Sequence, residues 1–433
     1  MTGTNVFADD LKLTPFWWDD VPRPALPQTP PPAKADVVVI GSGYTGLAAA
    51  LQTARGGRHT VVLDAQDAGF GCSTRNGGQI STSVKHGYAA LARRFGAQPA
   101  FRLVREGQNS LAWVGAFVKD EGIDCDFRIS GRFHAAHNPA RYEALAQALA
   151  SQPKGLETAA HMVPRAEQSS ELGSDIYYGG IVHEQHASVH PARFHQGMLD
   201  RAVQAGVGII PHCAATAIDR DGVGFRVACA GGSIAARNVV VATNGYTGPL
   251  IPWLRRRVIP IGSYIIATEQ IPPATMARLM PRGRVVSDTR KVVYYYRPSP
   301  DNRRILFGGR VSYKETDPRR SGPPLHAEMA RIFPDIRDVR ISHSWAGFVA
   351  YTFDEMMHLG NRDGLFYAMG YCGSGVGMAG YLGTRIGQQV LGLPEGATGF
   401  DNLPFESRPY YWGNPWFLAP SVAWYRWIDR SGH

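Results

Sequence analysis

The stretch that decides the fold runs from Ala35 to Gly46 and reads ADVVVIGSGYTG. Its first half, Ala35 to Ile40, is mostly β-branched and meets glycine at once, which is typical of a strand buried on both faces. Its second half, Gly41 to Gly46, has the spacing G-x-G-x-x-G, and a helix is predicted from about Tyr44 to Arg55. These glycines allow a tight turn, a close approach of backbone to a pyrophosphate, and close packing of helix on strand. The stretch predicts the first turn of a dinucleotide-binding domain.

A second strand is predicted at His59 to Asp64, so strand, turn, helix and strand form one parallel βαβ unit of about thirty residues. Asp64 ends the second strand, where a carboxylate can accept hydrogen bonds from ribose hydroxyls. The helix N-terminus adds N–H donors and a positive dipole for phosphate. The unit predicts nucleotide binding, but these residues alone do not separate FAD from NAD.

Length and composition set the class of protein. The chain has 433 residues, 44% hydrophobic and 19% charged, which suits two or three domains and excludes disorder as the main state. The formal net charge is +9, but the basic residues form short, separated groups without a nucleic-acid reading motif, so nucleic acid is not expected as a partner. Five scattered cysteines argue against a disulfide framework. We expect a soluble, cytoplasmic protein without a signal peptide or a membrane span.

Two groups of histidines are candidate metal ligands. One comprises His183, His186 and His190, and the other pairs His134 with His137. The first group falls in a predicted strand and turn, without helical i, i+4 geometry and without a nearby Glu or Cys. No metal site is therefore predicted.

The segment after the second strand, Gly69 to Gln79, separates FAD from NAD. It reads GFGCSTRNGGQ and offers hydroxyls, a cation and close backbone for phosphates and a flavin ring. It resembles the segment that lines FAD in the glycine/D-amino-acid oxidase family of flavoproteins, in particular the bacterial branch typified by γ-glutamylputrescine oxidases.

Two later segments add to the resemblance, which covers roughly residues 15 to 395. Thr243 to Tyr246 resembles the family's turn against the adenosine half of FAD. Gly370 to Gly377 resembles the second glycine turn, whose helix N-terminus stabilises negative charge on the reduced flavin. The residues that the resemblance and the first glycine turn assign to FAD are Gly41, Ser42, Gly43, Tyr44, Thr45, Gly46, Asp64, Ala65, Gly71, Cys72, Ser73, Thr74, Arg75, Asn76, Gly77, Gly78, Gln79, Ala214, Thr243, Asn244, Gly245, Gly347, Gly373, Ser374, Gly375 and Val376.

Two departures from the family pattern bear on the cofactor. Sarcosine-oxidase-like relatives hold FAD through a cysteine three residues before the threonine of a Thr-x-Asp segment. Here the segment is Thr352 to Asp354 and that position is Val349, so non-covalent FAD is expected. The same relatives place an oxygen-activating lysine before a glycine that matches Gly308, where this chain has Ile305 to Phe307. The electron acceptor, O2 or another carrier, stays open.

The expected fold is α/β, or α+β overall, with a Rossmann-like FAD-binding domain interleaved with a substrate domain on a mixed or antiparallel sheet. Both domains are discontinuous. The FAD-binding domain takes residues 33–95, 175–250 and 340–395, the substrate domain takes 96–174 and 251–339, residues 1–32 form an aromatic and proline-rich arm, and residues 396–433 form a C-terminal extension.

The resemblance implies that the protein oxidises a C–N bond of an amine or amino acid, with hydride transfer from the α-carbon to flavin N5 and hydrolysis of the imine. Tyrosines could wall the pocket, an arginine could hold a carboxylate and an aspartate could pair with an ammonium group. The candidate catalytic residues are Tyr264, Tyr296, Arg297, Trp345, Thr352 and Asp354, with Tyr294 as a further wall residue.

Two alternatives remain at this point. One is an NAD(P)-dependent dehydrogenase that uses the same first glycine turn, which a bound flavin would exclude. The other is a flavin-holding subunit or assembly protein without amine oxidase activity of its own, which reduction of the flavin by an amine would exclude. The sequence names neither the amine nor the oligomeric state.

Overall fold

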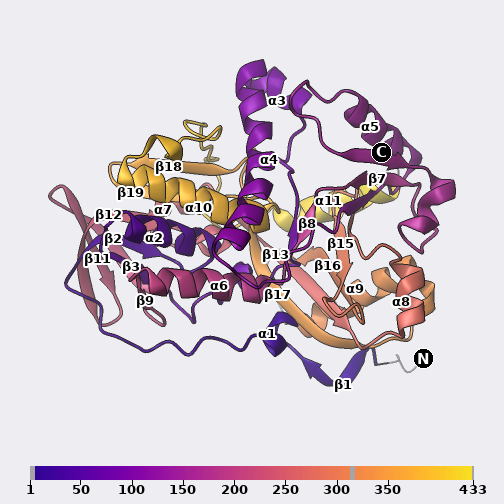
Figure 1. Cartoon of the computed structure of the whole chain (residues 1–433), viewed down its shortest axis with the longest axis horizontal. Helices are drawn as coiled ribbons and strands as arrows, with labels where there is room; N and C mark the ends of the chain where they lie inside the picture. The colour runs from indigo at the N-terminus through magenta and orange to yellow at the C-terminus, as the bar shows by residue number, and fades with distance from the viewer. Residues whose placement is uncertain (1–4, 313–316, 432–433) are drawn as a thin grey trace.

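The computed structural model describes residues 5–312 and 317–431, and its two large sheets occupy opposite ends of the long axis (Figure 1). Helices α2 and α10 cover the smaller sheet. The helices are α1 (Trp17–Asp20), α2 (Tyr44–Arg55), α3 (Tyr88–Phe95), α4 (Ala97–Asp120), α5 (Pro139–Ala150), α6 (Pro191–Gln204), α7 (Pro252–Arg255), α8 (Pro273–Leu279), α9 (Pro318–Ile332), α10 (Gly375–Leu391) and α11 (Leu418–Ser431).

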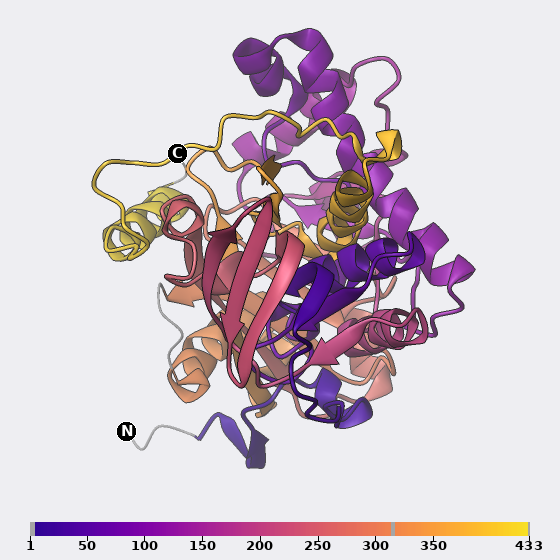
Figure 2. The ribbon, with the colours of Figure 1, turned by 90° about the vertical axis from the view of Figure 1, so that its left-hand side faces the viewer.

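The eight-stranded sheet is built on the predicted βαβ unit. Strand β2 pairs in parallel with β3 on one side and with β12 on the other, and Val37, Val38 and Val39 are fully buried. Figure 2 looks at this end of the molecule, with the strands of residues 215–241 in pink beside the indigo α2. The path runs β10 (Ala215–Asp221), β11 (Gly224–Cys229), β12 (Gly232–Val241), β2 (Lys34–Ile40), β3 (Thr60–Leu63), β9 (Gly208–Ile210), with β19 (Leu365–Met369) on β12 and β18 (His358–Arg362) on β19.

The second sheet has nine strands, and most of its neighbouring strands are antiparallel. Its longest pairing joins β13 to β17, from Ile259 opposite Tyr351 to Thr268 opposite Ile341. The order is β1 (Phe7–Lys12), β17 (Ile341–Tyr351), β13 (Ile259–Thr268), β16 (Ile305–Ser312), β15 (Tyr294–Pro298), β14 (Val285–Asp288), β5 (Arg132–Ala135), β7 (Gly180–His183) and β6 (Ala160–Val163); a separate pair joins β4 (Gln79–Ile80) to β8 (Ala187–Ser188).

The domain bounds stay a prediction, and several elements pack with another part of the structure than those bounds suggest. Strands β7 and β17 were expected in the FAD-binding domain and belong to the nine-stranded sheet. Helix α4 was expected in the substrate domain, and its buried Leu103 and Val114 pack into the core of α2 and α10. The reason is that a strand's own residues do not name its partner, and β17 pairs with a strand about 80 residues earlier.

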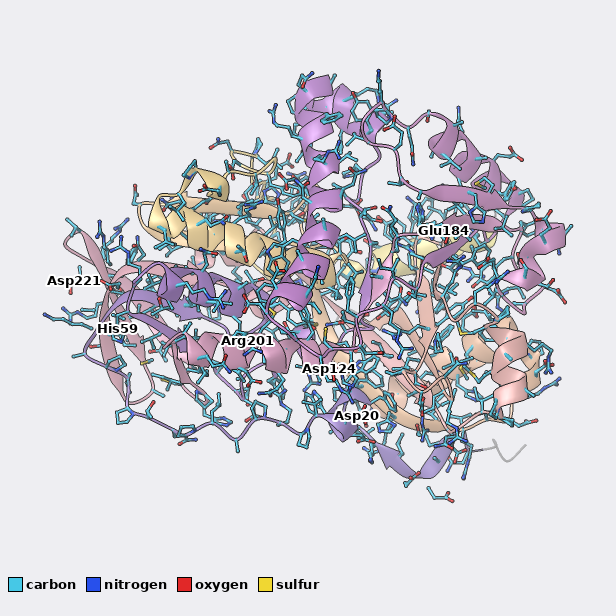
Figure 3. The ribbon with its side chains drawn as sticks, in the orientation of Figure 1. Asp20, His59, Asp124, Glu184, Arg201 and Asp221 are labelled. Carbon is cyan, nitrogen blue, oxygen red and sulfur yellow. The ribbon has the colours of Figure 1, made fainter. Side chains whose placement is uncertain are left out.

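The N-terminal arm takes part in both halves of the molecule. Strand β1 adds in parallel to the edge of β17, and α1 buries Trp17 completely. Residues 21–33 then run along the outside of the molecule to β2 (Figure 1). The carboxylate of Asp20, at the end of α1 (labelled in Figure 3), lies 3.4 Å from Nε2 of His190. The arm is thus part of the packed structure.

Among residues 5–312 and 317–431, no helix combines the length and the hydropathy that crossing a membrane requires.

Candidate active site

A cavity of about 1400 Å³ is lined by residues of both large sheets. Its lining begins at the glycine turn after β2 and includes residues 69–73 and 75–77, the turn after β12 and the N-terminus of α10. It continues along β13, β14 and β15 of the nine-stranded sheet. One cavity therefore joins the predicted nucleotide site to the sheet of the predicted substrate domain.

The first glycine turn has the geometry that its sequence predicts. Gly41 has φ +102°, a backbone angle that residues with a side chain rarely adopt. A Cβ on Gly46 would lie 1.8 Å from the carbonyl oxygen of Gly41. Ser42 donates from its backbone N–H (2.9 Å) and its hydroxyl (2.5 Å) to the carboxylate of Asp64. Asp64 lines the cavity and is fixed where ribose hydroxyls are expected.

The segment 72–78 is folded onto itself by Asn76. The Asn76 amide donates to the carbonyls of Cys72 and Ser73, both at 3.0 Å, and its oxygen accepts from the N–H of Gly78 at 2.8 Å. The hydroxyl of Ser73 accepts from the N–H of Tyr44 at 2.9 Å, which ties the segment to the start of α2. The two predicted cofactor segments therefore form one wall.

Two tryptophans of the arm hold this wall from outside the cavity. The indole N–H of Trp17 donates to the carbonyl of Asn76 at 2.8 Å. The indole N–H of Trp18 donates to the hydroxyl of Thr74 at 3.1 Å. Neither tryptophan lines the cavity, so each acts on the wall through a neighbour.

Arg75, in the same segment, also accepts a hydrogen bond from a tryptophan indole. Trp345 donates its indole N–H to the Arg75 carbonyl at 2.8 Å. The Arg75 guanidinium lies between the rings of Trp18 and Phe70, at 4.9 and 4.3 Å from their centroids. We call Trp17, Trp18 and Trp345 the indole clamp.

The second glycine turn, residues 370–377, forms another part of the cavity wall. The N–H of Gly370 donates to the side-chain oxygen of Asn244 at 2.9 Å, which joins this turn to the one after β12. Gly373 has φ +99°, and α10 begins two residues later with its N-terminus in the cavity wall. The positive end of a helix dipole thus faces the cavity, where it favours a negatively charged group.

The predicted FAD residues can now be placed. All of them line the cavity except Ser42, Gly46, Thr74, Gly78 and Gly245, which hold the backbone of the lining segments. Backbone that a Cβ would block, a fixed carboxylate and a helix N-terminus are the groups that a dinucleotide needs. The residues of this structure fit FAD.

The predicted substrate residues are placed differently. Thr352 lines the cavity, whereas Tyr264, Tyr296, Arg297, Trp345 and Asp354 do not. Strand alternation is the reason for the tyrosines, because neighbouring residues of a strand face opposite sides. Tyr296 stacks on Phe307 in the core with ring centroids 5.4 Å apart, and Tyr295, its neighbour, lines the cavity.

The two charged candidates are committed to other partners. The guanidinium of Arg297 donates to the carbonyls of Val189 at 2.9 Å and Gly78 at 3.3 Å. The carboxylate of Asp354 accepts from His358 at 3.0 Å and from the N–H of Met356 at 3.1 Å. Tyr294 also belongs to the core of the nine-stranded sheet, where its ring stacks on Phe307. These residues hold the frame of the site and do not touch its cavity.

Several cavity residues were not predicted from the sequence. The C-terminal helix α11, within the predicted extension, contributes Leu418, Val422 and Tyr425 to the wall. The carboxylate of Asp429 fixes this helix by accepting from the N–H groups of Lys291 (2.7 Å) and Val292 (3.0 Å). Other unpredicted wall residues are Lys85, Arg132, His134, Ser263, Ser287, Arg290 and Tyr295. For Tyr295, the period of two in the tyrosine strand was the usable signal.

The buried histidines predict a loss of stability in acid. Burial lowers the pKa of His183 and His195 to about 4 and that of His186 to about 2, from an ordinary value of 6.5. As the pH falls below 6.5, these histidines therefore bind more protons in the unfolded chain than in the folded one. We expect the free energy of unfolding to fall by about 1.4 kcal/mol per pH unit for each such histidine.

Urea denaturation between about pH 7 and pH 4 measures this slope. His195 donates from Nε2 to the carbonyl of Ser42 at 2.8 Å, so His195→Gln keeps a donor and loses the titration. That variant should have a smaller slope than the wild type, whereas His59→Gln, at an exposed residue (Figure 3), should not. Equal slopes in all three proteins would contradict this prediction.

Within the described part of the chain, no group of three or more His, Cys, Asp or Glu side chains is arranged to hold a metal ion. The rings of His183 and His186 stack on each other at 4.6 Å.

Known proteins resemble this chain over most of its length. The model of the family described as "DAO: FAD dependent oxidoreductase" matches residues 36–389. "Probable oxidoreductase OrdL" of Rhizobium meliloti is 32% identical over 416 residues, which are 94% of this chain and 95% of the relative. "Gamma-glutamylputrescine oxidoreductase" of Escherichia coli is 30% identical over 402 residues, 92% and 93% of the two chains. Glycine oxidase from Geobacillus kaustophilus has a similar fold, with a TM-score of 0.74, 19% identity, and coverage of 88% and 100%.

Proposed function

Because the chain belongs to the family of FAD dependent oxidoreductases, we propose that it oxidises a C–N bond of a small amine or amino acid. FAD supplies the chemistry by accepting a hydride from the carbon next to nitrogen, and the resulting imine is hydrolysed in water. The expected family, the α/β fold with two interleaved sheets, and FAD as cofactor are confirmed. Neither the NAD(P)-dependent dehydrogenase nor the flavin-holding subunit is favoured.

The continuity of the cavity is the observation that carries the proposal. The lining passes from the predicted flavin wall directly to Ile261, Ile265 and Phe348 of the nine-stranded sheet. These apolar side chains exclude water, so an amine is desolvated there and favours its neutral form, the form from which hydride leaves. The chain thus orients the amine beside the flavin wall, and no acid or base of the protein is required for the transfer.

The relatives' printed names support an amine as the substrate. One relative acts on gamma-glutamylputrescine by its name and shares 30% of its residues with this chain over nearly the full length. We therefore place γ-glutamylated and free diamines first among the candidate substrates.

A cytoplasmic location also stays a prediction, supported by five cysteines that are all free thiols.

Anaerobic titration of the purified flavoprotein with a panel of amines tests the proposal. The panel contains diamines, their γ-glutamyl derivatives and α-amino acids, and each compound is matched with the alcohol of the same carbon skeleton. We expect at least one amine to bleach the flavin while its alcohol does not. Equal bleaching by amine and alcohol, or none by any amine, would reject amine oxidation.

We further predict that FAD is bound without a covalent bond. Val349, at the position where relatives carry the linking cysteine, lines the cavity and has no nucleophilic group. Cys372 also lines it, but burial raises the pKa of its thiol to about 11 and its Sγ contacts the Gly370 carbonyl at 3.1 Å. A thiol in this state is a poor nucleophile. Acid precipitation should leave the flavin in the supernatant, and a yellow pellet would contradict the prediction.

A further inference from the structure

The C-terminal part of the chain exposes a group of aromatic side chains that amine oxidation does not use. Four tryptophans between residues 412 and 427 have exposed fractions of 53–65%, whereas every other tryptophan of the chain is buried or half-buried. Large apolar rings gathered on a surface are a mark of a binding site. We call the following residues the aromatic face: Tyr410, Trp412, Trp416, Trp424 and Trp427.

The aromatic face is built by a loop and by the helix that follows it. In the loop, the ring of Tyr410 lies edge-on to that of Trp416, with centroids 6.3 Å apart. On α11, Trp424 stacks on Trp427 at 4.9 Å, as side chains three residues apart on a helix can. Loop and helix adjoin, because Trp416 stands two residues before the start of α11.

The other side of α11 fixes the direction in which its tryptophans point. Leu418, Val422 and Tyr425 line the cavity, and the Asp429 carboxylate accepts from two backbone N–H groups of the loop after β14. Figure 2 shows α11 in bright yellow at the edge of the molecule. The helix therefore holds its cavity side inward and presents Trp424 outward.

The charged side chains around the aromatic face are mostly cationic. Residues 407–428 contain Arg408 and Arg426 and no Asp or Glu. The guanidinium of Arg256 lies over the ring of Trp412, 3.9 Å from its centroid, in a stretch, residues 222–268, that also has no Asp or Glu. Glu406, just before the loop, pairs with Arg94 and Arg408 at 2.9 and 2.8 Å.

This charge decides between the partners that an aromatic surface could take. A second copy of the chain would bring the same arginines against one another, and like charges in an interface cost free energy. An anionic surface is complementary to them. Tryptophan and tyrosine are also the residues that collect at the interface of a bilayer, where the ring meets apolar chains and the N–H or O–H meets the headgroups.

We propose that the aromatic face binds the surface of an anionic lipid bilayer. The arginines attract the headgroups, and the tryptophan rings enter the interface, with α11 parallel to the surface. The contact is peripheral and does not depend on amine oxidation. Because α11 is also part of the cavity wall, the bound protein holds its cavity next to the bilayer.

Flotation of the holoenzyme with lipid vesicles tests the proposal without turnover. One set of vesicles is phosphatidylcholine alone, and the other contains about 30% phosphatidylglycerol, which gives it a negative surface potential. We expect binding to the anionic vesicles to be at least about tenfold stronger and to weaken as NaCl is added. Equal binding to both vesicles, or no binding to either, would overturn the proposal.

Substitutions in the aromatic face test where the bilayer binds. The double variant Trp416→Ser/Trp424→Ser should bind the anionic vesicles at least about tenfold more weakly than wild type. Arg426→Gln, at an exposed arginine of α11, should weaken binding about fivefold. Val223→Ser is the control, since Val223 is 97% exposed in the turn between β10 and β11 and should leave binding unchanged. Wild-type binding by the folded double variant would reject the aromatic face as the site.

Two further measurements decide the remaining cases. If the double variant fails to fold, anionic vesicles with brominated acyl chains are added to wild-type protein: quenching of tryptophan emission supports the proposal, and unchanged emission rejects it. Sedimentation equilibrium tests the second copy as partner. A wild-type dimer that the double variant converts to monomer, with unchanged vesicle binding, would assign the aromatic face to an interface between copies and reject the bilayer.

Discussion

Trp17→Ala is expected to lower the free energy of unfolding by about 3–5 kcal/mol, although the side chain lies outside the cavity. The side chain is fully buried, lies edge-on to the ring of His190 at 4.9 Å, and donates to the carbonyl of Asn76. Its removal leaves a cavity and also frees the wall segment that faces FAD. We therefore expect FAD affinity to fall together with stability, although Trp17 itself is outside the cavity.

Trp17→Phe separates the two effects, because it keeps most of the buried ring and removes the N–H. Its cost should be smaller, about 1 kcal/mol for the lost hydrogen bond. Urea denaturation gives the stability, and titration of apoprotein with FAD, followed by flavin fluorescence, gives the affinity. Trp424→Ala is the matched control, since that side chain is 57% exposed. Equal effects of Trp17→Ala and Trp424→Ala would contradict the role of the indole clamp.

Gly46→Ala is expected to weaken FAD binding about tenfold or more and to destabilise the fold by about 1–3 kcal/mol. The added Cβ would lie 1.8 Å from the Gly41 carbonyl oxygen and 3.2 Å from Cγ1 of Val39. Neither the turn nor the strand can yield without moving α2 away from β2. The helix N-terminus would then withdraw from the place where the pyrophosphate is expected.

Gly87→Ala provides the control for this variant. Gly87 has ordinary φ, −69°, and a Cβ there would meet nothing within 4 Å. The same titration with FAD should give wild-type affinity for Gly87→Ala. Wild-type affinity for Gly46→Ala as well would show that the close approach of α2 and β2 does not govern FAD binding.

The nucleotide-site residues could be predicted from the sequence because they lie close together along the chain. A glycine turn between a β-branched strand and a helix occurs in one stretch of chain, and Asp64 follows at a fixed distance. The structure places Gly41, Gly43 and Asp64 in the cavity wall as that stretch predicts. The same holds for α2, whose observed bounds, Tyr44–Arg55, are those predicted.

The substrate wall was less readable because it depends on pairing between distant strands. In the run Tyr294 to Tyr296 all three residues suit a strand, and only the sheet's position decides that Tyr295 faces the cavity. Arg297 and Arg132 look alike in sequence, yet one binds backbone carbonyls and the other faces the cavity. Arg132 meets Ser287 only through the pairing of β5 with β14, which no local pattern announces.

The central claim is that an amine delivers a hydride to FAD within this cavity. Anaerobic mixing of the holoenzyme with the best amine of the panel, followed by loss of the visible flavin absorption and by assay of the carbonyl product, tests it most directly. We predict one equivalent of carbonyl product for each equivalent of flavin reduced, and slower reduction when the hydrogens on the carbon next to nitrogen are replaced by deuterium. Flavin reduction without carbonyl product, or no reduction by any amine, would contradict the claim.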